Sequence, residues 1–143
     1  MTAQQGHLTG GCDCRAIRYA LSQPPFDADF CHCRTCQRTT GAPVSAWMDV
    51  KAAEVTWQTD ARPTEYASSD DIRRGFCAAC GSTLTYRSQS HPAYLTLAIT
   101  SLDNPEAMTP RYHIHTNSSV SWLLLSDDAP RHETNRTKAD TGD

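Results

Sequence analysis

The chain has 143 residues with a formal net charge of −3 at pH 7, a length that suits one domain with a modest core. The acidic balance argues against a surface that binds nucleic-acid phosphates, and no segment approaches the roughly 20 apolar residues of a membrane span. The first residues carry neither a basic leader nor an apolar stretch, so we expect a cytoplasmic protein. Its 7 cysteines would then be kept reduced, and their odd number favours metal binding over a complete set of disulfides.

Short strands separated by turn residues account for most of the chain. A first strand is expected after His7, and its partner over 16–21 follows a tight turn at 10–14. One helical segment is predicted over 34–40, closed by Gly41. Further strands are predicted at 26–30, 44–50, 54–58, 64–66, 72–76, 82–86, 94–99, 111–116 and 120–125. The pattern predicts a mainly β protein of antiparallel sheets and hairpins with few helical turns. A single domain is expected over 1–133, and the polar tail 134–143 is expected to be mobile.

The densest chemical feature is a run of three cysteines, Cys31-His32-Cys33-Arg34-Thr35-Cys36. A C-x-C-x-x-C run in a tight loop can turn three soft thiolates onto one zinc ion. Structural zinc sites are closed by four protein ligands, whereas catalytic sites keep one position for water or substrate. Cys31, Cys33 and Cys36 therefore predict a working zinc site with an open position. Closure by a histidine and a redox role for the thiols are the alternatives.

The other four cysteines form two short pairs that lie far apart in the sequence. Cys12 and Cys14 follow two glycines, and Cys77 and Cys80 are followed by Gly81, where a metal-binding turn would reverse direction. Together they predict one closed, structural zinc site that ties an early hairpin to a later one. The alternative is that all four are buried free cysteines acting as small core residues. The sequence thus predicts two zinc ions per chain.

Several arginines lie close to these cysteines in the sequence. They are Arg15, Arg34, Arg38, Arg73 and Arg74. Thiolate ligands leave a zinc site with excess negative charge, so the simple interpretation is that the arginines balance it. Arg34 lies inside the three-cysteine run and Arg38 two residues after it, and we predict that one of them also binds a substrate carboxylate through a bidentate contact.

Three cysteine-containing stretches resemble the glutathione-dependent formaldehyde-activating enzyme family, which includes centromere protein V. They are residues 10–19, 31–38 and 74–82, and further similar residues lie at 101–105, 110–114, 122 and 127–130. The resemblance implies a β-tent fold with two zinc sites: Cys12, Cys14, Cys77 and Cys80 would be the structural set, and Cys31, Cys33 and Cys36 the second set. From the ligand count, we expect the zinc at Cys31, Cys33 and Cys36 to be the labile, catalytic one, because it has one fewer protein ligand. His113 matches a family position and is the histidine expected to have a role at the site. Arg34 departs from the family pattern, in which serine is usual.

The resemblance also implies an activity, the reversible joining of glutathione and formaldehyde to S-hydroxymethylglutathione, grouped with the carbon-sulfur lyases. For this chain we expect that reaction class, with a small-molecule thiol such as glutathione and a small aldehyde as partners. Two other functions compete: a protein that binds glutathione or a thiol adduct without turnover, and a scaffold in which both zinc ions are structural. The scaffold predicts a fourth protein ligand at the second zinc. The sequence leaves the substrate and the oligomeric state open.

Overall fold

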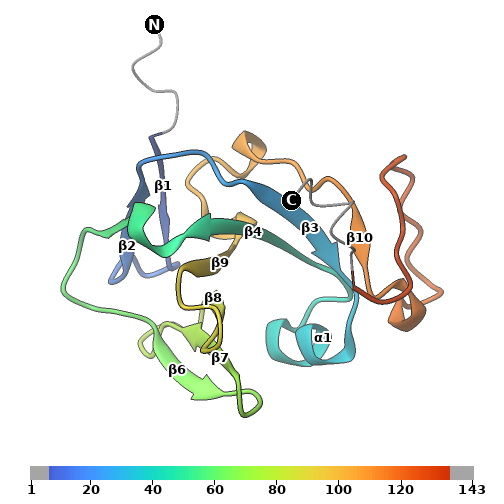
Figure 1. The fold of residues 1–143 in the computed structure, drawn as a ribbon, viewed down its shortest axis with the longest axis horizontal. Helices are drawn as coiled ribbons and strands as arrows, with labels where there is room; N and C mark the ends of the chain where they lie inside the picture. Colours follow the sequence, from blue (N-terminus) through green and yellow to red (C-terminus); the bar gives the residue numbers. More distant parts are fainter. Residues whose placement is uncertain (1–6, 136–143) are drawn as a thin grey trace, which may run out of the picture.

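The structure is a computed structural model and describes residues 7–135 (Figure 1). Its strands form two sheets: a three-stranded sheet in the order β1-β2-β5 and a seven-stranded sheet in the order β10-β3-β4-β9-β8-β7-β6. The strands are β1 Leu8–Gly11, β2 Arg18–Leu21, β3 Asp27–Cys31, β4 Ser45–Lys51, β5 Val55–Trp57, β6 Thr64–Ala67, β7 Ile72–Phe76, β8 Thr83–Ser88, β9 Tyr94–Ala98 and β10 His113–Ile114. One α-helix, α1, covers Arg34–Thr40, and short 3-10 turns lie at Ala52–Glu54, Ile99–Ser101, Pro105–Ala107 and Thr116–Ser118. The predicted mainly β architecture is confirmed.

Alternation along the central strands decides which face of the large sheet meets the core. In β4, Met48 and Val50 are buried in the main apolar cluster, together with Leu97 of β9 and Tyr19 and Leu21 of β2. The small sheet therefore packs against one face of the large one. Because successive side chains on a strand point to opposite faces, the residues between these core positions project from the other face of β4 and β9. That second face carries the polar side chains of the candidate site.

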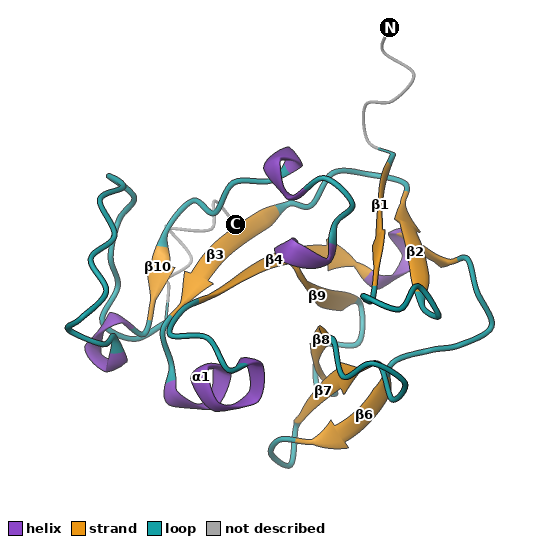
Figure 2. Cartoon of the chain, turned by 180° about the vertical axis from the view of Figure 1, so that it is seen from behind, coloured by secondary structure: helices purple, strands orange, loops and turns teal. Residues whose placement is uncertain are grey.

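Helix α1 follows β3 after only two residues and places part of the cysteine run at the end of the large sheet (Figure 2). The Cys33 sulfur caps its first turn by accepting a hydrogen bond from the backbone N–H of Cys36 at 3.2 Å. The helix ends at Gly41, whose φ of 74° is the left-handed conformation that glycine adopts without strain. The predicted helix over 34–40 is thus confirmed with the same bounds.

The C-terminal part of the chain departs from the prediction. No strand forms over 120–125, so that prediction is wrong, and Trp122 and Leu124 are 73% and 88% exposed. The reason is that the outer edge of β10 is already covered: the N–H of His113 donates to Pro130 O, and the N–H of His132 donates to His113 O. The predicted strand 111–116 shrinks to two residues, which pair with β3 in parallel. Most of the predicted tail, residues 136–143, lies outside the described residues.

Within residues 7–135, no helix combines the length and the apolar character that crossing a membrane would require.

Candidate metal centres and active site

Two turns from distant parts of the chain bring the four-cysteine set together. The first turn joins β1 to β2 and carries Cys12 and Cys14, and the second follows β7 and carries Cys77 and Cys80. The four sulfurs all lie within 4.8 Å of one another. The Cys12 and Cys14 sulfurs are 3.6 Å apart, and the Cys14 and Cys77 sulfurs are 3.8 Å apart. The pairing predicted from the sequence is therefore the one that the fold assembles.

The chemistry of this cluster fits a soft metal ion such as zinc. The Cys12 sulfur accepts a hydrogen bond from the N–H of Ile17 at 3.2 Å, and the Ser82 hydroxyl lies 3.1 Å from the Cys80 sulfur. The bond to Ser82 stabilises the thiolate and lowers the pKa of Cys80 to about 6. Four sulfurs at this spacing match the ligand number and type of a closed structural site. Gly81, with a φ of 81°, lets the second turn reverse onto Cys77 through a backbone hydrogen bond of 2.7 Å.

The three-cysteine set lies where β3 passes into α1. Cys31 ends the strand, Cys33 caps the helix, and Cys36 is in its first turn. Their three sulfurs lie within 4.8 Å of one another, and among residues 7–135 no fourth histidine, cysteine or carboxylate completes that cluster. The histidine closure considered from the sequence is thus absent from the part of the chain that the structure describes.

A buried cation, Arg74 of β7, faces these sulfurs. Its Nη1 and Nη2 atoms lie 3.6 and 3.7 Å from the Cys36 sulfur, and the residue is 7% exposed. The guanidinium also lies 5.0 Å from the centre of the Tyr86 ring. Hydrogen bonding among the thiols makes them unequal, because the Cys31 thiol lowers the pKa of Cys33 while its own pKa is raised. A buried positive charge beside three sulfurs favours their ionised, metal-binding form.

A cavity of about 270 Å³ opens beside the three sulfurs. Its walls include all three cysteines, the Arg74 guanidinium, Tyr86 and His115. A larger cavity of about 940 Å³ lies beside Cys12 and the ion pair of Arg18 with Asp103. None of the cysteines of the three-cysteine set lines it. The smaller cavity is the candidate active site, because it is the one of these two cavities that the cluster of three sulfurs borders.

The structure separates the other predicted site residues from this cavity. Arg34 and Arg38 lie on the exposed side of α1, and neither lines the cavity. Arg34 donates instead to Gln37 Oε1 at 2.5 Å. His113 is 1% exposed and lies outside the cavity, whereas His115, two residues on, forms part of its wall. Arg74 contacts the Cys36 sulfur instead. The sequence places Arg74 only among the arginines that balance thiolate charge.

His113 has a different position, in a buried chain of hydrogen bonds that ends at the cysteine run. Its Nε2 lies 3.0 and 3.1 Å from the Asp127 carboxylate oxygens, and its Nδ1 lies 2.8 Å from Nε2 of His32. Because His113 Nε2 carries the proton that it donates to the Asp127 carboxylate, His113 Nδ1 has no proton and accepts a hydrogen bond from His32 Nε2. Arg131 holds Asp127 at 3.0 Å. Desolvation opposes the charged carboxylate, but the bonds from His113 and Arg131 outweigh it and lower the pKa of Asp127 to about 2.

We expect Asp127→Ala to loosen the three-cysteine loop, because His32 stands between two of its cysteines and would lose the tautomer that Asp127 imposes through His113. The cost should be about 1 kcal/mol, below the roughly 1.5–3 kcal/mol of a hydrogen bond to a charged group, since the carboxylate is 37% exposed and water can replace it. Metal should also leave this loop faster. Thermal melts and chelator-driven zinc release measure both, with the exposed neighbour Asp128→Ala as control. Equal melting and release for the two variants would contradict this role.

A mainly β fold with two sulfur clusters, each compact enough to hold a metal ion, defines a class of small cysteine-rich β proteins with candidate metal centres. The model of one family, the glutathione-dependent formaldehyde-activating enzymes, matches residues 7–118, and the chain belongs to that family.

The chain is similar to known proteins both in sequence and in structure. A Schizosaccharomyces pombe protein named an uncharacterized lyase is 30% identical over 90 residues, which cover 60% of this chain and 63% of that relative. The match thus spans less than two thirds of the relative's length. The crystal structure of a Rhodobacter sphaeroides protein has a TM-score of 0.58 at 18% identity, covering 86% of this chain and 98% of the other. This second likeness shows the fold.

Proposed function

We propose that the protein is a zinc-dependent carbon-sulfur lyase that joins a small thiol, with glutathione the first choice, to formaldehyde or another small aldehyde, and that also cleaves the adduct. The observation that carries this proposal is a cluster of three cysteine sulfurs with no fourth ligand among residues 7–135, placed at the wall of a cavity beside a buried arginine. Membership of the family and the name of the yeast relative support the same reaction class. We further propose a cytoplasmic, single-domain protein.

The proposed reaction needs no oxidant or reductant. The thiol sulfur forms a bond to the carbonyl carbon, the π bond of the carbonyl opens, and the thiol proton ends on the oxygen; cleavage reverses each change. Zinc bound to Cys31, Cys33 and Cys36 would supply one thing, a lower pKa for a substrate thiol that takes the open position. A second zinc at Cys12, Cys14, Cys77 and Cys80 would stabilise the fold.

The protein's own residues contribute charge and orientation. Arg74 offsets the negative charge of the three thiolates, which is costly beside an apolar wall such as Trp47. The cavity confines the thiol and the aldehyde so that sulfur meets the carbonyl carbon, and such orientation is a large source of rate enhancement. The proton must also move, and Tyr86 and His115 are titratable groups that face this cavity. His113, buried outside it, acts as a positioning residue through His32.

Exchange at equilibrium tests turnover directly. Thiols and formaldehyde combine in water without help, so a protein that only binds the adduct shifts amounts in proportion to its own concentration. A catalyst instead speeds the exchange while leaving the equilibrium unchanged, because it binds the transition state more tightly than the ground state. We expect NMR exchange spectroscopy to show faster exchange between glutathione and its hydroxymethyl adduct with protein far below substrate concentration. Unchanged exchange with zinc confirmed in both sites would exclude this reaction and leave a binding role.

A further inference from the structure

A second cavity continues the first along the same face of the large sheet. It measures about 500 Å³ and shares Asp49, Tyr86 and Thr96 with the cavity at the cysteines. The shared residues are neighbours across three strands, because Asp49 of β4 pairs with Thr96 of β9, and Thr96 pairs with Tyr86 of β8. Tyr86 in turn pairs with Arg74 of β7. One row of side chains therefore leads from the arginine at the sulfurs to Asp49.

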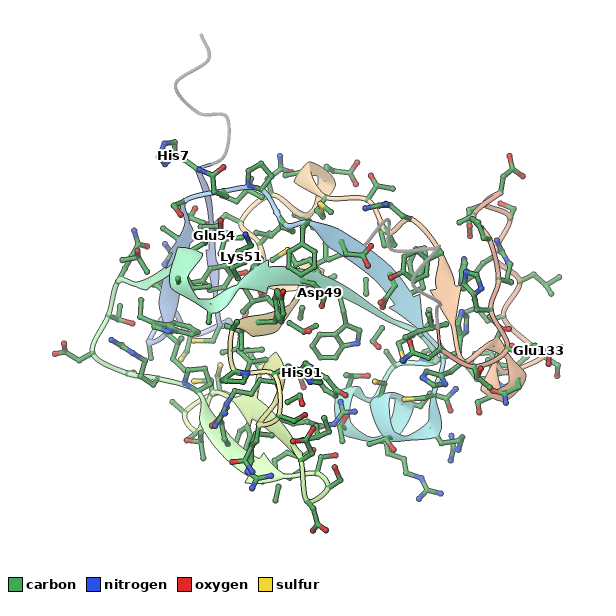
Figure 3. The ribbon with its side chains drawn as sticks, in the orientation of Figure 1. His7, Asp49, Lys51, Glu54, His91 and Glu133 are labelled. Carbon is green, nitrogen blue, oxygen red and sulfur yellow. The ribbon has the colours of Figure 1, made fainter. Side chains whose placement is uncertain are left out.

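Negative and positive side chains occupy different parts of the second cavity. Asp49 is half-buried and is oriented by the Thr96 hydroxyl, which donates to its Oδ1 at 2.7 Å. Lys51 lies two residues further along β4, on the same face, and is exposed at the outer part of the cavity with His91. In Figure 3, Asp49 and His91 lie near the centre of the view and His7 at its edge. Going outward from the cysteines, a carboxylate comes first and basic groups follow.

We propose that the second cavity binds the α-amino-acid head of a peptide thiol, with Asp49 accepting hydrogen bonds from the ammonium group and Lys51 and His91 contacting the α-carboxylate. The assignment rests on the proposed function, since it takes the thiol to lie at the three cysteines. Glutathione has the matching order of groups: a central thiol, then a γ-glutamyl arm that ends in an ammonium and a carboxylate on one carbon.

The dimensions agree with this assignment. The three cysteine sulfurs and Asp49 line the same cavity of about 270 Å³, a span comparable with the roughly 10 Å that an extended tripeptide reaches. Phe26 and Tyr94 stand at the wall of the second cavity with ring centroids 5.6 Å apart and cover part of it. A half-buried carboxylate distinguishes an ammonium from a neutral group, because a charged hydrogen bond is lost when either partner becomes neutral.

The test compares two thiols on two variants. We expect Asp49→Asn to weaken glutathione binding to the zinc-loaded full chain roughly tenfold to a hundredfold, the range for lost hydrogen bonds between charged groups. Binding of N-acetylglutathione, which lacks the ammonium, should be equally weak in wild type and variant. Isothermal titration calorimetry measures both. Asp60→Asn, which neutralises an exposed carboxylate outside the two cavities, is the matched control and should bind glutathione as wild type does.

The outcomes separate this inference from the proposed function when exchange is measured on the same samples. Equal glutathione binding by wild type and Asp49→Asn overturns recognition of the head, and faster exchange in those samples still supports the enzyme. Binding that depends on Asp49 without any faster exchange supports recognition of the head and overturns the enzyme. Exchange that is as fast with 2-mercaptoethanol as with glutathione also overturns recognition of the head. If glutathione binding and faster exchange are both absent, the recognition of the head and the proposed enzyme are both overturned.

Discussion

Cys12→Ser is expected to leave the protein largely unfolded at 37 °C. The four-cysteine set joins turns whose cysteines Cys14 and Cys77 are 63 residues apart in the sequence, and structural zinc contributes on the order of 10 kcal/mol of apparent binding free energy that is also folding free energy. Whole domains have net stabilities of about 5–15 kcal/mol. Cys12 is in addition 5% exposed and packs with Ile17 and Leu84. Loss of one ligand should therefore remove most of the margin by which this chain folds.

Thermal melts with zinc analysis measure this effect, and a second ligand tests its origin. Cys80 is exposed, so Cys80→Ser disturbs little packing, yet it removes a ligand of the same set. If the metal rather than the core packing causes the loss, Cys80→Ser should also melt far below wild type and lose one zinc. Ala79→Ser, which changes an exposed side chain between Cys77 and Cys80 and keeps all four sulfurs, is the control and should melt near wild type. Wild-type melting of both cysteine variants would show that the cluster has no structural role.

Cys33→Ser is expected to have the opposite profile: nearly wild-type folding and complete loss of accelerated exchange. The Cys33 sulfur caps α1 by accepting from the N–H of Cys36, and a serine hydroxyl is among the best helix N-caps. The substitution therefore preserves the local structure while it removes one of three soft ligands. Zinc content should fall from two ions to one, and the exchange of glutathione with its hydroxymethyl adduct should return to the uncatalysed rate.

Circular dichroism, zinc analysis and NMR exchange on one preparation measure these three effects. Thr35→Ser is the control, because it changes an exposed side chain in the same helical turn and keeps every cysteine. Accelerated exchange that survives Cys33→Ser would exclude the three-cysteine cluster as the active site. Unfolding as severe as that of Cys12→Ser would instead mean that both clusters are structural.

Local spacing was sufficient to predict several features. The helix over 34–40 forms as predicted because the signals that bound it, the Cys33 cap and Gly41, act within a few residues. The sulfurs within each cysteine turn come together as predicted, since a C-x-C or C-x-x-C spacing places them close to each other, whereas the four-cysteine set also needs the fold to join two turns that lie 63 residues apart. The strand predicted over 120–125 does not form because its formation depends on distant parts of the chain. Alternating apolar residues form a strand only where a sheet edge accepts them, and residues 130–134 already cover the edge of β10.

By itself, then, the sequence determined the mainly β architecture, the helix and the grouping of seven cysteines into a set of four and a set of three. Only the tertiary structure decided which charges face the sulfurs. Arg34 and Arg38 are near the cysteines in the chain but project from the exposed side of α1, while Arg74 reaches Cys36 from a strand 38 positions away. The row from Arg74 to Asp49 likewise depends on the register of four strands. Register is set by long-range packing of the core face, which short sequence patterns do not encode.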